Sequence, residues 1–89
     1  MMSDAIAKIS EHGLLTDWAE ENSGKGKVFN NRTAVDWFIR QHRAELIRSG
    51  QLIVRRGSAG SLVGPQFERV VLDILRGESL RTLEQEAAA

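Results

Sequence analysis

The sequence predicts a mainly helical domain with one β-hairpin near its middle. Apolar residues recur at helical spacing in several segments, most clearly at Phe67, Val70, Val71, Ile74 and Leu75. An apolar run, 52–54, is followed by two arginines, a glycine-rich stretch, 57–60, and a second short apolar run. This order is typical of a strand–turn–strand unit. The chain has 89 residues and no cysteine. Its length suits a single domain, which neither disulfides nor thiolate zinc ligands can stabilise.

The first third of the chain predicts two short helices and a loop. A first helix is expected over 3–13, ended by its final glycine. A second is expected over 14–22, with Thr16 as its cap. Residues 23–27 contain two glycines and two lysines and indicate a flexible basic loop, after which Val28 and Phe29 return the chain to the core.

The next helix carries the most informative pattern. Thr33 followed by Asp36 resembles a capping box at its start, and Ser49–Gly50 suits its end. One face between these signals is apolar and includes Val35, Phe38, Ile39, His42 and Leu46. The opposite face is polar and basic. The pattern allows either one continuous helix or two pieces separated near Gln41.

The hairpin follows, with strands expected over 52–56 and 61–63. Gly64–Pro65 then opens a strongly amphipathic helix, since proline is tolerated in a first helical turn. Gly77 is expected to end that helix. A last helical segment, 79–86, carries two leucines on one side.

This order of helices, a basic helix, a two-stranded hairpin and a closing helix is that of a winged helix-turn-helix. We therefore assign residues 1–77 to a winged helix-turn-helix domain that binds DNA, and residues 78–89 to a C-terminal helical extension. Leu80 and Leu83 leave that extension with an apolar side that its own chain does not cover. Such a side suits dimerisation with a second copy.

The charges are unevenly distributed although the formal net charge is zero. Residues 24–56 hold eight basic and two acidic residues, a formal charge of +6, whereas the rest of the chain sums to −6. A neutral protein divided in this way presents one basic surface. The division favours an anionic partner.

The basic stretch suits double-stranded DNA. Arginine can bind guanine, and glutamine can bind adenine, in the major groove, so Arg40, Gln41 and Arg43 are the candidates for base contacts. The residues before the helix are candidates for phosphate contacts beside its N-terminus, namely Lys25, Lys27, Asn30, Asn31, Arg32 and Thr33. Arg55 and Arg56 of the hairpin would follow the backbone or enter the minor groove.

No arrangement of residues in the sequence organises catalysis, so we expect a protein that is not an enzyme and that uses no metal, cofactor or small-molecule ligand. His12 and His42 are far apart, and without cysteines they form no metal signature. Trp18 and Trp37 are expected in the core or at an interface rather than as platforms for unpaired bases. With no apolar run near the roughly 20 residues of a membrane span and no secretory signal, we expect a cytoplasmic protein.

Part of the chain resembles excisionase-like winged helix-turn-helix proteins of plasmids and phages. The resemblance lies in the segment 33–47, the stretch 46–52, the hairpin and Val63–Phe67. The similarity covers about residues 30–76. It implies sequence-specific binding to duplex DNA, as dimers or cooperative arrays, in transcriptional control or recombination. The chain departs from that family in its long basic loop, 23–31, where the family has a tight turn, so the resemblance does not identify the helix that enters the groove.

Three functions follow as expectations. The first is a transcriptional repressor of a mobile genetic element that acts as a homodimer and covers promoter DNA. The second is an architectural factor like an excisionase, which bends the duplex. The third belongs to another class: a protein-interaction or inhibitor module that docks its basic face on an acidic partner.

Overall fold

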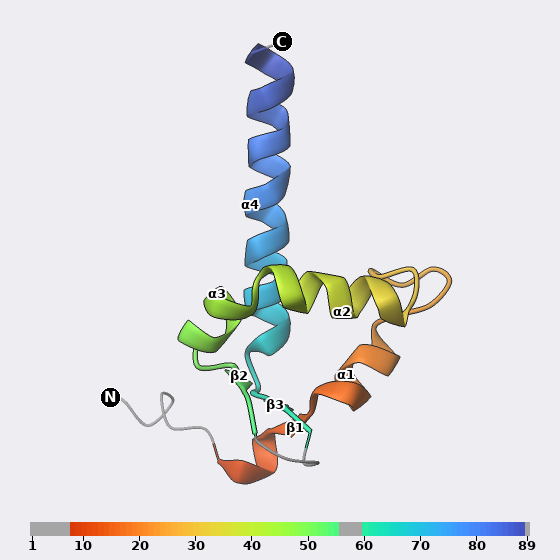
Figure 1. The fold of residues 1–89 in the computed structure, drawn as a ribbon, viewed down its shortest axis with the longest axis vertical. Coiled ribbons are helices and arrows are strands. Elements are labelled where there is room, and N and C mark those ends of the chain that lie inside the picture. Colours follow the sequence, from red (N-terminus) through yellow and green to blue (C-terminus); the bar gives the residue numbers. More distant parts are fainter. Residues whose placement is uncertain (1–7, 56–59, 89) are drawn as a thin grey trace.

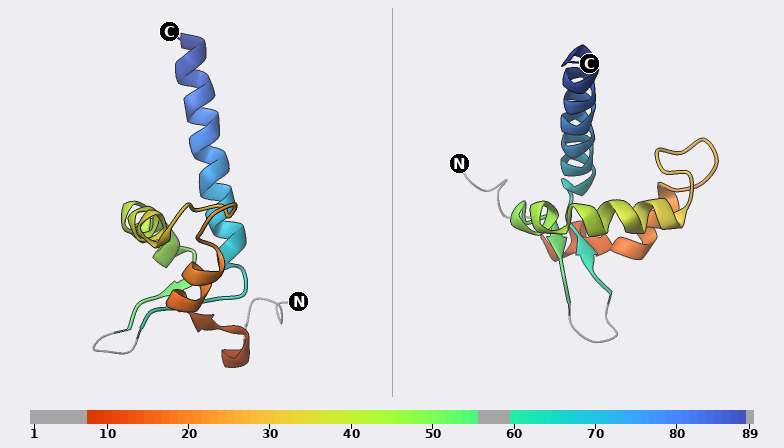
Figure 2. Two further views of the ribbon diagram at one scale, coloured as in Figure 1. Left: turned by 90° about the vertical axis from the view of Figure 1, so that its right-hand side faces the viewer. Right: turned by 45° about the horizontal axis from the view of Figure 1, so that its top comes forward.

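The described residues, 8–55 and 60–88, form a mainly helical domain with a small three-stranded antiparallel sheet in the computed structural model (Figure 1). The helices are α1 (Leu15–Glu21), α2 (Arg32–Gln41), α3 (Arg43–Arg48) and α4 (Phe67–Ala88), and the strands are β1 (Gly13–Leu14), β2 (Leu52–Ile53) and β3 (Leu62–Val63). A 3₁₀ turn, Ile9–Glu11, precedes β1. Helices α1–α3 and the sheet make up a body from which the second half of α4 projects (Figures 1 and 2).

The sheet has the strand order β1-β3-β2. The expected hairpin is confirmed by the pairing of Leu52 with Val63, although each of its strands has only two residues. The turn residues 57–59, and Arg56 beside them, lie outside the described residues. The third strand, β1, was not predicted, and it pairs Gly13 with Val63.

The expected helix over 3–13 is wrong in its described part. Only a 3₁₀ turn forms there, His12 is extended, and Gly13 begins a strand instead of ending a helix. Ile9, the described residue of the apolar pattern that predicted this helix, is 92% exposed and does not contribute to the core. Residues 1–7 lie outside the described residues.

Helix α1 forms as expected but without the predicted cap. The extended residue before it is Leu14, and no side chain caps its first turn, whereas Thr16 lies inside the helix. The loop from 22 to 31 folds back on itself, because the Gly24 N–H donates to the Phe29 carbonyl at 2.8 Å. Phe29 is buried, as predicted, whereas the same expectation is wrong for Val28, which is 65% exposed.

The basic helix is two helices. His42 has φ −112° and ψ 20°, and it ends α2 and begins α3. The predicted capping box is wrong: Asn31 caps α2 by accepting from the Ala34 N–H at 2.9 Å, and Asp36 instead accepts from Arg32 at 3.2 Å. Gly50 closes α3 with φ +81°, as expected of a terminal glycine.

The core joins all the helices to the sheet. Its buried side chains are Ala19, Phe29, Val35, Phe38, Leu46, Leu52, Val63, Phe67, Val71 and Ile74. Trp18 packs against it edge-on, with its ring centroid 4.8 Å from that of Phe67. The faces predicted from helical spacing in α2, α3 and α4 are therefore confirmed.

Helix α4 runs without interruption from Phe67 to Ala88. The expected stop at Gly77, and the separate helix expected over 79–86, are wrong. A glycine inside a helix costs only about 1 kcal/mol relative to alanine, which the flanking helix formers offset. Pro65 lies in the turn before α4, two residues earlier than the first helical position.

Candidate nucleic-acid interface

One side of α2, which we call its outer side, faces away from the core residues of this helix. At about 100° per residue, Thr33, Trp37 and Arg40 fall on one side, opposite Val35 and Phe38. The first three are exposed and the last two are buried. The core contacts of α2 therefore leave this side accessible to a partner.

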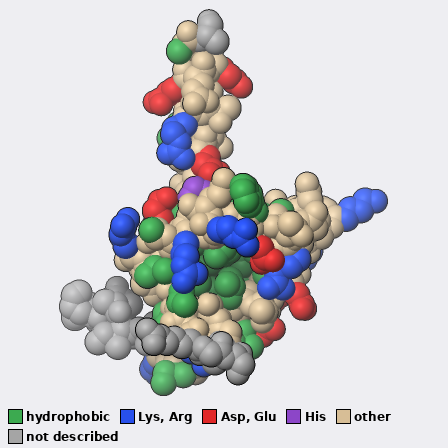
Figure 3. Space-filling view, viewed as in Figure 1, with side chains coloured by type: hydrophobic (Ala, Val, Ile, Leu, Met, Phe, Trp, Pro, Cys, Tyr) green, Lys and Arg blue, Asp and Glu red, His purple; other side chains and the backbone are tan. Residues whose placement is uncertain are grey.

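Arginines gather along α2 and α3. Figure 3 shows Lys and Arg side chains over these two helices, and the exposed arginines there are Arg32, Arg40, Arg43 and Arg48. We call the exposed side chains of α2 and α3, together with those of residues 53–55, the basic face. Within the described residues, no carboxylate lies within ion-pair distance of Arg40, Arg43 or Arg48. These three guanidinium groups are available to an anion.

The remaining predicted residues have more local roles. Lys27 Nζ donates to the Glu21 carbonyl at 2.9 Å, so this lysine closes the C-terminus of α1, while Lys25 is exposed on the loop. Asn31 is occupied as the cap of α2, and Arg32 is paired with Asp36. Both residues stay exposed, as does Asn30.

Arg55 marks the hairpin side of the basic face. Its Nε donates to the Gly60 carbonyl at 2.7 Å, which ties the two ends of the hairpin turn together. The left view of Figure 2 shows that β2 and β3 lead to the same side of α4 on which α2 and α3 lie. The structure thus brings Arg40, Gln41 and Arg43 to the same side as Arg55.

The basic face also carries apolar side chains. Trp37 is 57% exposed and is therefore no core residue, which leaves the interface as its expected place, whereas Trp18 packs against the core. Ile47, Ile53 and Val54 are exposed as well, and Figure 3 shows apolar surface between the arginines. The sequence contained a signal for Trp37, which follows Thr33 by four residues and precedes Arg40 by three.

Most acidic residues lie elsewhere, since α2 and α3 carry only Asp36 and Glu45. Asp17, Glu20 and Glu21 of α1 line an open hollow of the surface, and α4 carries most of the remaining described acids. The charge division found along the sequence is therefore a division in space. An anionic partner is drawn to α2 and α3 rather than to α1 or α4.

His42, at the junction of α2 and α3, contacts α4 through its side chain. Its Nε2 lies 2.8 Å from Glu78 Oε2 and its Nδ1 lies 3.4 Å from Glu45 Oε1, while its ring packs against Phe38. These contacts fit the partly buried histidine that its place on the apolar face predicted. Among the described residues, no three His, Cys, Asp or Glu side chains are arranged to hold a metal ion.

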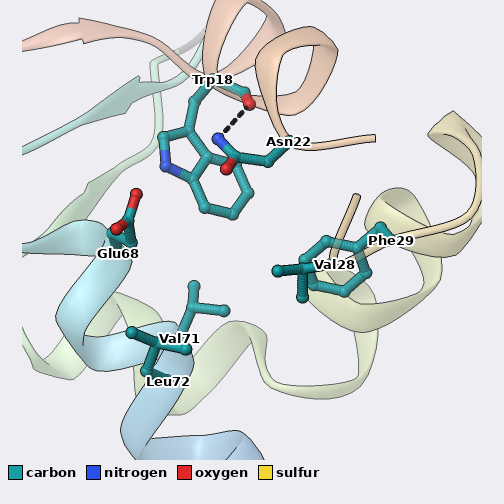
Figure 4. Close-up of a pocket in the computed structure, with 7 residues that line it drawn as sticks. All are labelled: Trp18, Asn22, Val28, Phe29, Glu68, Val71 and Leu72. Atoms are coloured by element: carbon teal, nitrogen blue, oxygen red, sulfur yellow. Dashed lines mark hydrogen bonds between the residues drawn. The ribbon is translucent and has the colours of Figure 1, made fainter. Parts of the chain in front are cut away.

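A small cavity lies between α1, the loop and α4 (Figure 4). Its lining consists of Trp18, Asn22, Val28, Phe29, Glu68, Val71 and Leu72. The volume is about 90 Å³, which admits a few water molecules and not a nucleotide or a cofactor. This cavity adds no binding function to the basic face.

The fold and surface define a small helical domain with a basic, partly apolar face on α2, α3 and the hairpin. No family model matches the chain, and no similar protein was found among curated proteins or solved structures. Across the described part of the chain, no helix combines the length and the apolar character that crossing a membrane requires.

Proposed function

We propose that this chain is a sequence-specific double-stranded DNA-binding protein of the winged helix-turn-helix class, and that it represses transcription in a mobile genetic element. The observation that carries the proposal is the exposure of Arg40, Arg43 and Arg48, without carboxylate partners in the described residues, on the side of α2 and α3 that faces away from the core. Unpaired guanidinium groups on exposed helices suit both phosphates and guanine edges.

Helix α2 is the element proposed to enter the major groove, because its outer side makes no core contacts. Arg40 and Gln41 then face base edges, and Arg43 follows at the start of α3. Arg32 at the start of this helix, Lys25 on the preceding loop and Arg55 on the hairpin supply phosphate contacts that set its register. Bound over a promoter, a domain of this kind excludes polymerase by occupying the same duplex.

Two further features support the winged helix-turn-helix class. Three helices, α1, α2 and α3, precede a β-hairpin that leads to the same side of α4 as α2 and α3 (Figure 2). The loop between α1 and α2 is longer than the 3–4 residues usual in a helix-turn-helix. Its hydrogen bonds to Asn22 and Phe29 nevertheless hold it in one folded shape.

A protein-interaction module is the second candidate, and the exposed apolar residues favour it. Trp37 and Ile47 lie among the arginines, and tryptophan with arginine is a combination enriched at protein interfaces. Contact with thymine methyl groups in the major groove explains the same residues. The two candidates differ in the partner, so binding experiments separate them.

The test is a selection of bound duplexes from a random library at near-physiological salt. It compares the wild type with Arg40→Ala, Arg43→Ala and the control Arg69→Ala, which removes an exposed arginine of α4 outside the basic face. We expect an enriched motif that the first two changes lose or relax and that the control keeps. Absence of enrichment, with no salt-sensitive binding to any duplex, would contradict DNA binding and favour a protein partner.

A further inference from the structure

We propose that the outer part of α4 pairs antiparallel with the same segment of a second copy, and that the dimer holds two basic faces that point in opposite directions and so joins two duplexes. The pairing depends on α4 alone. The joining of duplexes rests on the proposed DNA binding, and the experiments below separate the two.

The segment in question is residues 76–88, which we call the stalk. It projects from the body in every view (Figures 1 and 2), and it contributes no residue to the core. Leu80 and Leu83 are 61% and 60% exposed. Most of the stability of a helix in a protein comes from packing of its apolar face, so a partner that covers the two leucines would stabilise the stalk.

The charges of the stalk favour a second copy in antiparallel orientation. Arg76 and Arg81 lie toward its base, where Arg76 pairs with Asp73 and Glu78 contacts His42, and Glu84 and Glu86 lie toward its tip. When Leu80 of one copy faces Leu83 of the other, the arginine end of each stalk lies beside the glutamate end of its partner. A parallel pair would place like charges together, which destabilises helix pairs.

The leucine side of the stalk faces away from the basic face. Glu78 points toward α2 and α3, because it contacts His42 at their junction. At about 100° per residue, Leu80 and Leu83 lie about 200° and about 140° further round the helix than Glu78. They therefore face the side of α4 opposite to α2 and α3.

The left view of Figure 2 shows what this direction implies. Helices α2 and α3 and the described strands of the hairpin lie on one side of α4, so a copy docked on the other side carries its own basic face outward. Whether the two stalks pair parallel or antiparallel, the two basic faces point away from each other. One straight duplex cannot reach both faces, whereas two duplexes can each occupy one.

The first experiment measures the oligomeric state of the full chain by sedimentation equilibrium. Leu80→Glu/Leu83→Glu is compared with the control Thr82→Glu/Gln85→Glu, which adds two acids on the side of the stalk away from the leucines. We expect a dimer for the wild type and the control and a monomer for the leucine variant, with circular dichroism to verify that each body is folded. A wild type that stays monomeric at several hundred micromolar would overturn the pairing.

Orientation is read from disulfides, because the chain has no cysteine of its own. In the antiparallel pair position 76 lies opposite position 87. We expect a mixed disulfide when Arg76→Cys and Ala87→Cys variants are combined, and little self-coupling of Ala87→Cys. Rapid self-coupling of Ala87→Cys without the mixed product would indicate parallel stalks and overturn the antiparallel assignment.

The joining of duplexes is tested by capture, with an immobilised selected duplex and a labelled duplex of the same sequence. We expect the wild type and the control to capture the labelled duplex, and the leucine variant to bind the immobilised duplex without capturing another. Capture by the leucine variant would overturn the proposal. A stable dimer that binds no duplex would refute the proposed DNA-binding function and leave the stalk pairing standing.

Discussion

Asn31 determines where α2 begins. Its side chain accepts from the Ala34 N–H at 2.9 Å, while the neighbouring Thr33 is exposed and makes no capping contact in the structure. Both residue types are good caps. The choice between them sets the position of the first turn of α2, and with it the angular position of Arg40.

Replacing Asn31 by alanine removes this cap. We expect Asn31→Ala to lower the free energy of unfolding by about 1 kcal/mol, the usual worth of a helix cap. The matched control, Thr33→Ala, is expected to change it by less than about 0.5 kcal/mol, as for surface positions without a special role. Urea denaturation followed by circular dichroism measures both, and an equal loss in the two variants would contradict the assigned cap.

At the scale of elements, Gly50 and Gly77 differ in backbone conformation, and only Gly50 ends a helix. Gly50 has φ +81° and closes α3, whereas Gly77 lies inside α4, where an added Cβ would meet nothing within 4 Å. Only the first position needs the conformational freedom of glycine. The continuity of α4 through Gly77 is what makes the stalk a single projecting helix.

Alanine substitutions at these two positions are expected to have effects of opposite sign. Gly77→Ala should raise the free energy of unfolding by about 0.5–1 kcal/mol, because alanine favours the helix and restricts the unfolded chain. Gly50→Ala should lower it by about 1 kcal/mol or more, because an L-residue is strained at positive φ. Thermal unfolding of both variants checks the signs, and a destabilised Gly77→Ala would show that α4 bends there.

Elements also show how far the sequence predicts this fold. Helical spacing identified the core faces that contain Val35, Phe38 and Phe67, because each amphipathic pattern lies within one short segment. Two features depend instead on residues far apart in the sequence. Strand β1 forms because Gly13 pairs with Val63, and the break between α2 and α3 lies at His42, which contacts Glu78. No local pattern contains such pairings.

For the candidate site, too, the sequence predicts what local patterns contain and misses what depends on distant contacts. The arginines of α2 and α3 were found from charge and spacing, and their exposure agrees with that prediction. Lys27 and Asn31 remain predicted phosphate contacts, and in the structure their side chains also serve the ends of α1 and α2. Only the folded loop reveals this, because it brings Lys27 back to the Glu21 carbonyl.

At the scale of the whole molecule, zero net charge coexists with a basic face and an acidic remainder. This separation predicts that affinity for duplex DNA responds to the local charge of the basic face and not to the net charge. If about four arginines and lysines neutralise phosphates, the binding constant should fall about a hundredfold between 50 and 200 mM salt. Fluorescence anisotropy with a labelled duplex measures this slope.

A substitution tests whether the arginines of the basic face cause this salt dependence. Arg48→Ala should reduce the slope of log K against log salt by about 1 and weaken binding to all sequences alike, as expected of a phosphate contact. Arg69→Ala on α4 should leave it unchanged. Equal effects of the two changes would place the phosphate contacts elsewhere.

The two tryptophans give the molecule separate optical reporters. Trp18 stacks edge-on against Phe29 and Phe67, and its Nε1 is buried without a hydrogen-bond partner in the structure, whereas Trp37 lies exposed on the basic face. In a Trp18→Phe variant the remaining indole emission should be red-shifted, accessible to iodide, and quenched by added duplex. In a Trp37→Phe variant the emission should be shorter in wavelength, shielded from iodide, insensitive to duplex and altered by unfolding. Intrinsic fluorescence can then follow ligand binding and folding independently in one unlabelled chain.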